Sequence, residues 1–159
     1  MTGTTDVGAG PARHPVLHRV TLGLAFAYLF ALVLIAFWPT PVDRDAHDSI
    51  EQVVGSVQTN GGPTWLRYSA IEFGANIALF VPVGLFVVLL AGARRWKLGI
   101  LVGFAATCTI ELGQLVFLTG RVATPYDVVA NTGGAVIGAL LAVAALAVLR
   151  RVRARVPAR

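Results

Sequence analysis

The sequence predicts an all-α membrane protein, a multi-pass bundle of four transmembrane helices with a short exterior amphipathic helix. The composition is 56% hydrophobic and only 13% charged, and the mean hydropathy is +0.73, which is too apolar for a surface that faces water. Four apolar runs reach the length of about 20 residues that crosses a hydrocarbon core. These runs cover residues 20–38, 70–91, 98–118 and 126–149.

The two ends of the chain differ from the apolar runs. Residues 1–15 are rich in Gly, Thr, Pro and Ala and have no hydrophobic period, so we predict a disordered cytoplasmic leader. The first run is longer than the apolar region of a signal peptide and lacks a small-residue cleavage site, which predicts that it stays as an anchor. We therefore expect the transmembrane domain at 16–150, followed by a basic cytoplasmic tail at 151–159.

The exterior loop between the first two runs carries its own helical pattern. Apolar residues recur there at helical spacing, namely Ala46, Ile50, Val53, Val54 and Val57. Polar residues occupy the rest of the helical circumference. This pattern predicts a short amphipathic helix on the outer membrane surface or over the mouth of the bundle. We read His47, in the same segment, as a solvated side chain, and we predict no metal site and no cofactor.

Basic residues predict the orientation in the membrane. Of the 13 Lys and Arg residues, ten fall on one side: Arg13, Arg19, Arg94, Arg95, Lys97, Arg150, Arg151, Arg153, Arg155 and Arg159. Because cytoplasmic loops are enriched in basic residues, both termini of this multi-pass protein should be cytoplasmic. Attraction to anionic membrane lipids accounts for the pI near 10.4, so we predict no nucleic-acid partner.

Polar side chains interrupt three of the four runs. Two runs open with one pattern, a hydroxyl residue followed after three positions by a carboxylate and after four more by an Asn: Ser69, Glu72 and Asn76, then Thr124, Asp127 and Asn131. The third run carries Glu111 and Gln114. Ionisable groups are costly in hydrocarbon, so those that occur inside transmembrane segments are functional candidates.

The rise of an α-helix predicts how deep these side chains lie. At 1.5 Å per residue, three of them share a depth of about 10 Å below the outer surface: Asn76, Glu111 and Asn131. Glu72, Gln114 and Asp127 lie nearer the surface, with Arg121 in the loop above them. We therefore predict that these seven residues line one pocket that opens to the exterior.

Structural roles are the alternative for the same residues. The pairs Ser69–Glu72 and Thr124–Asp127 both have the form of a capping box, which would satisfy free amides in a first helical turn. Glu111 lies far from any helix start, so it needs a cation, a proton or a metal ion. An ion pair with Arg121 is the structural interpretation of that carboxylate.

An ordered set of motifs runs through the second half of the chain. It consists of NIALFVPVG at 76–84, ELGQ at 111–114, and then Arg121, Asp127, Asn131, Gly134 and Gly138. Together these resemble the VanZ-like family of small bacterial membrane proteins, named for a protein associated with low-level resistance to the glycopeptide teicoplanin. The chain differs where Glu72 stands in place of a common Asp, and where Thr124 and Tyr126 stand in a segment often richer in Asp.

Two classes of function fit the residues and the resemblance. As a binding protein, the chain would hold a lipid head group, a lipid-linked envelope precursor or a glycopeptide, contributing to envelope function or antibiotic resistance, with Arg121 on an anionic group. As an enzyme, it would use Glu111 as general acid or base on a lipid-linked phosphate substrate, with Glu72 and Asp127 able to bind Mg²⁺. The sequence shows no Ser–His or Cys–His motif and no phosphate-binding Gly loop, which favours the binding protein.

Overall fold

The computed structural model describes residues 15–38, 47–118 and 124–155. These residues form α1 (Pro15–Ala36), α2 (His47–Thr59), α3 (Tyr68–Ala91), the 3₁₀ helix η2 (Ala93–Arg95), α4 (Trp96–Phe117) and α5 (Pro125–Arg155). Four long helices are apolar enough to cross a membrane, namely α1, α3, α4 with η2, and α5. The predicted all-α fold class is confirmed. The predicted leader falls almost entirely outside the described residues, and the basic segment after residue 150 continues α5 as helix up to Arg155.

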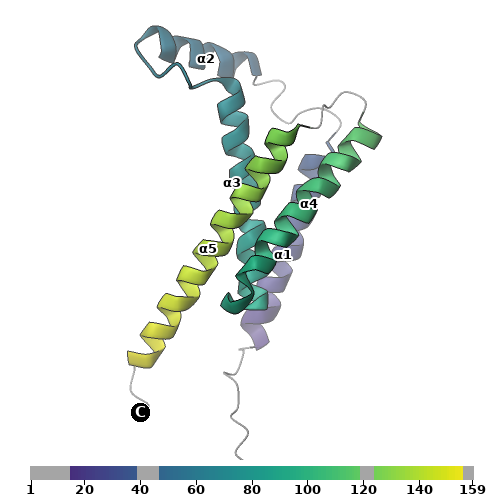
Figure 1. Cartoon of the computed structure of the whole chain (residues 1–159), viewed down its shortest axis with the longest axis vertical. Coiled ribbons are helices and arrows are strands. Elements are labelled where there is room, and N and C mark those ends of the chain that lie inside the picture. Colours follow the sequence, from purple (N-terminus) through teal and green to yellow (C-terminus); the bar gives the residue numbers. More distant parts are fainter. Residues whose placement is uncertain (1–14, 39–46, 119–123, 156–159) are drawn as a thin grey trace, which may run out of the picture.

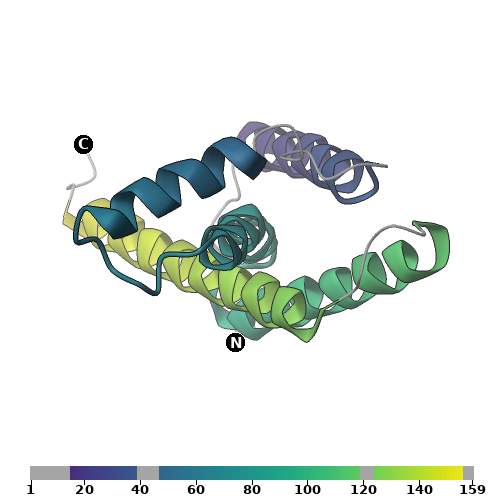
Figure 2. The same cartoon turned by 90° about the horizontal axis from the view of Figure 1, so that it is seen from above.

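Helix α3 lies at the centre of the bundle. It contacts α1, α2, α4 and α5, and Figure 2 shows it between α1 on one side and the α4–α5 pair on the other. Helices α3 and α5 run in the same direction, whereas α1 and α4 run in the opposite one (Figure 1). The phenol of Tyr28 on α1 donates a hydrogen bond to the carbonyl of Leu79 on α3, which joins the outlying helix to the centre.

Glycines bring α3 and α5 into backbone contact. A Cβ atom at Gly138 would collide with the carbonyl oxygen of Val81, and one at Gly84 would collide with the carbonyl oxygen of Ala135. Side chains are therefore excluded from this seam, and the helices approach as small-residue pairs do in membranes. The two helices are held at one relative rotation and height.

Helix α2 lies crosswise to α3 beyond the start of that helix and projects away from α4 (Figure 1). Its Val54 is buried, whereas Val53 and Val57 are exposed. The amide of Gln58 donates a 2.7 Å hydrogen bond to the carbonyl of Leu66, just before α3. The predicted short amphipathic helix is thus present, attached to the bundle through the turn that leads into α3.

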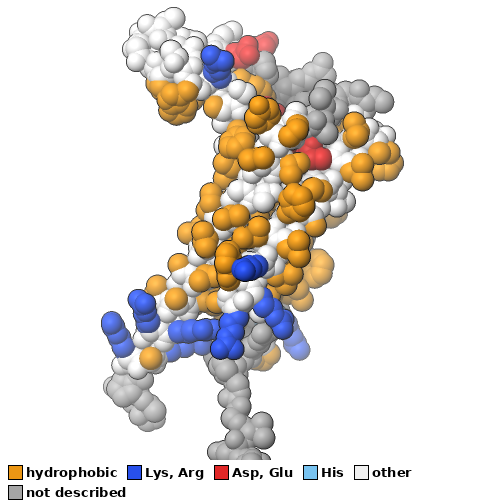
Figure 3. All heavy atoms as spheres, viewed as in Figure 1, with side chains coloured by type: hydrophobic (Ala, Val, Ile, Leu, Met, Phe, Trp, Pro, Cys, Tyr) orange, Lys and Arg blue, Asp and Glu red, His pale blue; other side chains and the backbone are white. Residues whose placement is uncertain are grey.

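Charge is distributed unevenly along the bundle. In Figure 3 most of the visible Lys and Arg side chains gather at the end where α1 begins and α5 ends, and the visible Asp and Glu side chains lie toward the other end. Apolar side chains cover the surface between them, and many large ones are exposed, including Phe26, Phe30, Leu101 and Leu140. A band of this kind suits the hydrocarbon core of a bilayer, because water would not solvate it.

Candidate functional site

Asp127 joins the start of α5 to α3. The Thr124 hydroxyl donates a 2.7 Å hydrogen bond to Asp127 Oδ2, and the Asp127 amide donates in return to Thr124 Oγ1 at 3.3 Å. This reciprocal pair caps the first turn of α5, as the pattern predicts. Asn76 Nδ2 donates a further bond of 2.7 Å to Asp127 Oδ1. The capping interpretation is therefore confirmed for the Thr124 hydroxyl, whereas the Asp127 carboxylate accepts from two side chains and links two helices.

The matching pattern at the start of α3 behaves differently. The residue that precedes α3 is Arg67, and its side chain makes no capping hydrogen bond. Ser69 is then the second residue of the helix rather than its cap, so the capping-box interpretation of Ser69 and Glu72 is wrong. Glu72 is exposed on the first turns of α3.

Asn131 is buried between α5 and α4. Its side chain is 5% exposed, and its Nδ2 atom donates a 2.9 Å hydrogen bond to the hydroxyl of Thr107, which is fully buried. Sequence reasoning missed Thr107, because a threonine within an apolar helix commonly bonds to its own helix backbone. The available signal was the four-residue spacing that places Gly99, Gly103 and Thr107 on the face of α4 that also carries Glu111.

The contacts between α4 and α5 define one antiparallel register. A Cβ atom at Gly99 would meet the Cβ of Ala139, and one at Gly103 would meet that of Ala135. One turn further along α4, Thr107 meets Asn131. Each step of four residues up α4 thus corresponds to four residues back along α5.

Glu111 lies one turn beyond Thr107 on α4, and Asp127 lies one turn before Asn131 on α5. The Glu111 side chain is half-buried, and its Oε2 atom is buried. Because α4 and α5 are antiparallel, both carboxyl groups lie beyond the Thr107–Asn131 contact, toward the same end of the bundle. We name six residues around this contact the polar cluster: Asn76, Thr107, Glu111, Asp127, Asn131 and Thr132.

Gln114 contacts a different helix. It is 8% exposed, and its Nε2 atom donates a 2.8 Å hydrogen bond to the carbonyl of Ala36, the last residue of α1. That carbonyl belongs to the final turn of α1, where no intrahelical donor is available. Gln114 therefore holds the end of α1 against α4.

The hydrogen bonds pair the predicted residues across different helices. Asn76 bonds to Asp127, whereas Asn131, one turn further along α5, bonds to Thr107 on α4. The rise along each helix alone did not predict these partners. Arg121 lies outside the described residues, so its predicted contact with these groups stays a prediction.

Two buried oxygens of the polar cluster lack hydrogen-bond partners within the part of the chain that the structure describes: Asn131 Oδ1 and Thr132 Oγ1. A buried polar atom without a hydrogen-bond partner lowers the free energy of unfolding by about 1–3 kcal/mol. An amide oxygen accepts only, so Asn131 Oδ1 requires a donor. Over the described ranges, no group of three or more His, Cys, Asp and Glu residues is placed to hold a metal ion.

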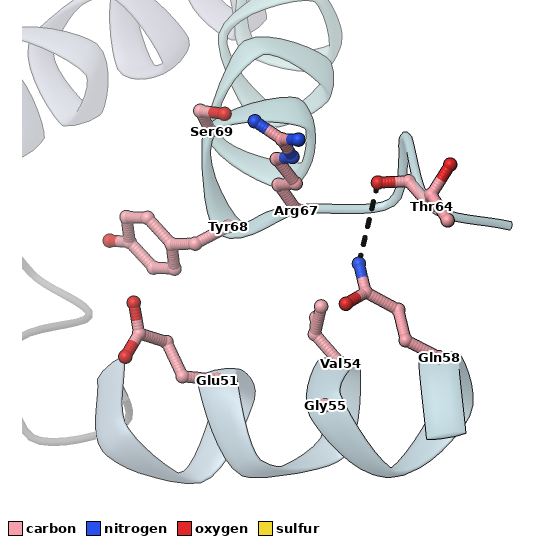
Figure 4. A pocket seen from close by; sticks show the side chains of 8 residues that line it. All are labelled: Glu51, Val54, Gly55, Gln58, Thr64, Arg67, Tyr68 and Ser69. Atoms are coloured by element: carbon pink, nitrogen blue, oxygen red, sulfur yellow. Dashed lines mark hydrogen bonds between the residues drawn. The ribbon is translucent and has the colours of Figure 1, made fainter. Parts of the chain in front are cut away.

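A separate groove lies between α2 and the start of α3 (Figure 4). Its volume is about 750 Å³, and it is lined by Glu51, Val54, Gly55, Gln58, Thr64, Arg67, Tyr68 and Ser69. None of the residues predicted for the site lines this groove. A 3.4 Å hydrogen bond from Gln58 on α2 to the carbonyl of Thr64 joins the two segments that line the groove.

Comparison with known proteins gives one match. A family model described as VanZ/LLP1 matches residues 25–148. Neither the curated proteins nor the solved structures compared with the chain contain a significant match. The matched range includes α3 and α4, the part of α1 from Ala25 onward, α5 up to Val148, and the whole of the polar cluster.

Proposed function

This chain is a membrane protein of the VanZ/LLP1 family, and from that premise we propose that its polar cluster binds the polar part of a cell-envelope molecule. The ligand is the head group of a lipid, a lipid-linked envelope precursor or a glycopeptide-type antibiotic. Binding would contribute to envelope function or to antibiotic resistance.

The observation that carries the proposal is the pair of buried oxygens without donors. Asn131 Oδ1 and Thr132 Oγ1 are adjacent in sequence on α5, within the outer half of an apolar helix. A ligand that offers hydroxyl or N–H groups would donate hydrogen bonds to both atoms. These bonds would offset the free-energy penalty of burying the two oxygens without partners. Sugar hydroxyls and peptide amides are such donors, and the envelope precursors and glycopeptides carry both.

The neighbouring carboxyl groups support the same ligand class. Asp127 accepts two side-chain hydrogen bonds, and Glu111 lies toward the same end of the bundle, one turn beyond Thr107. Carboxylates accept strong hydrogen bonds from ligand hydroxyl and amino groups. The expected role of Arg121 on an anionic group of the ligand belongs to the same proposal.

Thr132→Val tests this binding with little risk to folding. Valine has the shape of threonine, and the hydroxyl that it removes contributes no hydrogen bond within the described chain. We expect unchanged or slightly raised thermal stability, and binding about tenfold weaker, as for one lost hydrogen bond. The measurement is titration of the purified chain in detergent with teicoplanin and, separately, with a lipid-linked disaccharide precursor.

Thr109→Val is the matched control for that titration. Thr109 is exposed on α4, and its hydroxyl bonds to the carbonyl of Ala105 in its own helix. Binding by this variant should equal that of the parent. Equal binding by the Thr132 and Thr109 variants, or no saturable binding of either probe by the parent, would refute the proposed site.

Acid–base chemistry is the second candidate, and the position of Glu111 and Asp127 at the same end of α4 and α5 favours it. A carboxyl group at that end can exchange a proton with a substrate positioned between α4 and α5. Mass spectrometry of the lipid-linked probe after incubation distinguishes the two functions. A product that forms with the parent and is lost with Glu111→Gln would establish the enzyme, and an unchanged probe supports binding alone.

We propose that the end of the bundle bearing α2 faces the exterior and that both termini are cytoplasmic. The expectation is tested with single cysteines in a Cys108→Ser background. A cysteine at Thr59, exposed at the end of α2, should react with an impermeant thiol reagent in intact cells, and one at Ala154, near the end of α5, should react only after lysis. Reversed labelling would place the polar cluster on the cytoplasmic side. Antibiotics that act from outside the cell would then be excluded as ligands.

A further inference from the structure

Helix α5 extends beyond the helices that pack against it. By the register in which Gly99 meets Ala139, the first residue of α4, Trp96, is level with Ala142. Trp96 packs against the buried cluster that contains Ala142, and Leu146 also packs there. Residues 147–155 are all exposed and add about 13 Å of helix. Figure 1 shows this end of α5 projecting past the α3–α4 turn.

The projecting segment is amphipathic. At 100° per residue, Val148, Val152 and Leu149 fall within one arc of about 100°. The rest of the circumference carries four arginines: Arg150, Arg151, Arg153 and Arg155. The three apolar side chains are between 52% and 58% exposed. An apolar arc beside arginines is typical of helices that lie at a membrane surface.

The positive charge at this end has no nearby acid in the sequence. Neither 73–110 nor 128–159 contains Asp or Glu. The exposed Arg94, Arg95 and Lys97 add to the charge at the same end (Figure 3), and η2 contacts α5. The counter-charge for these cations must therefore come from outside this part of the chain.

We propose that the projecting end of α5, together with the 94–97 turn, is a docking surface for anionic lipid head groups. The Val148–Leu149–Val152 arc lies toward the acyl chains, and the arginines meet head-group phosphates, which their planar guanidinium groups bind through two parallel hydrogen bonds. The segment lies at the opposite end of the bundle from the polar cluster, so this inference is independent of the ligand proposed there.

The test is lipid binding by the full chain in detergent. Phosphatidylglycerol is titrated against the parent and against R150Q/R151Q/R153Q/R155Q, with phosphatidylcholine and inorganic phosphate as comparison probes. Each basic residue near an anionic surface strengthens attraction about fivefold, so the apparent Kd for phosphatidylglycerol should rise at least about tenfold in the variant. A version with Lys at the same four positions keeps the charge and should retain most of the affinity.

Arg67→Gln is the control, because Arg67 lies at the other end of the bundle beside α2. It should bind phosphatidylglycerol as the parent does. Equal affinity for phosphatidylcholine, or parental affinity in the four-Gln variant, would overturn the proposal. Competition by inorganic phosphate at the concentration at which the lipid binds would also overturn it, since a site for a free anion needs no membrane.

A second measurement keeps the proposal testable if the four-Gln variant fails to fold. Val152→Cys, in the Cys108→Ser background, is labelled with an environment-sensitive fluorophore and reconstituted in nanodiscs. The emission should shift to the blue when phosphatidylglycerol replaces part of the phosphatidylcholine, because the apolar arc then enters the interface. An emission that is the same in both lipid compositions would contradict docking of this segment.

Discussion

Gly138→Ala is expected to destabilise the chain strongly, whereas Gly133→Ala on the same helix is not. A Cβ atom at Gly138 would collide with the Val81 carbonyl oxygen and approach Leu85 N to 2.9 Å. These are backbone atoms of α3 that cannot rotate away, so α3 and α5 must separate. Overpacking of this kind costs about 1–3 kcal/mol, and more where the backbone itself is in the way. Nothing lies within 4 Å of a Cβ at Gly133, where Ala gains up to about 1 kcal/mol in helix propensity.

The measurement is thermal unfolding of the purified variants in one detergent. The Gly138 variant should unfold well below the parent, and the Gly133 variant at or above it. Gly84→Ala and Gly74→Ala provide the same contrast on α3, since a Cβ at Gly84 would collide with the Ala135 carbonyl and one at Gly74 meets nothing within 4 Å. Equal unfolding temperatures within either pair would show that the α3–α5 seam is looser than described.

Asp127→Ala should produce the second large loss of stability. The change removes the acceptor of Asn76 Nδ2 and of the Thr124 hydroxyl, and so breaks the link to α3 and leaves the Thr124 hydroxyl without its acceptor. The backbone amide of residue 127 still donates to Thr124 Oγ1, so this part of the cap of α5 remains. With two hydrogen bonds to a carboxyl group lost, the expected decrease in the free energy of unfolding in detergent is about 2–4 kcal/mol.

A double-mutant cycle isolates the link between the helices. The double variant Asn76→Ala/Asp127→Ala should lose less free energy of unfolding than the sum of the losses in the two single variants, because each single change removes the same hydrogen bond. Asn60→Ala is the control partner, since Asn60 is exposed and its side chain bonds to the carbonyl of Ser56. Its cycle with Asp127→Ala should be additive. Additive behaviour in the Asn76 cycle would mean that the bond contributes nothing to stability.

Local features of the fold were predictable because they depend on composition and period along a single helix. The four apolar helices and α2 lie where run length and the spacing of Val53, Val54 and Val57 predicted them, within a few residues at each end. The capping motif at Thr124 and Asp127 could likewise be recognised in the sequence. The similar pattern at Ser69 was misleading, because α3 begins at Tyr68 and its preceding residue is Arg67.

The polar residues were also identifiable from the sequence, because a carboxylate or amide stands out in an apolar run. Glu111, Asp127 and Asn131 were predicted to lie near one another, and in the structure Asn131 bonds to Thr107, one turn before Glu111 on α4. Thr107 could not be chosen from among the other threonines, since nothing in its own segment shows that an Asn on another helix will meet it.

By itself, the sequence determined the number of spanning helices, their apolar faces, the basic end of the bundle and the family, because these follow from side-chain chemistry read along one segment at a time. Only the tertiary structure decided the partners: Asn76 with Asp127, Asn131 with Thr107, and Gln114 with the end of α1. The spacing along a helix defines which side chains share a face, but not how far that helix slides or turns against its neighbour. Between α3 and α5 the slide and the turn follow from backbone contact at Gly84 and Gly138, and so the pairing of Asn76 with Asp127 depends on two residues that carry no side chain.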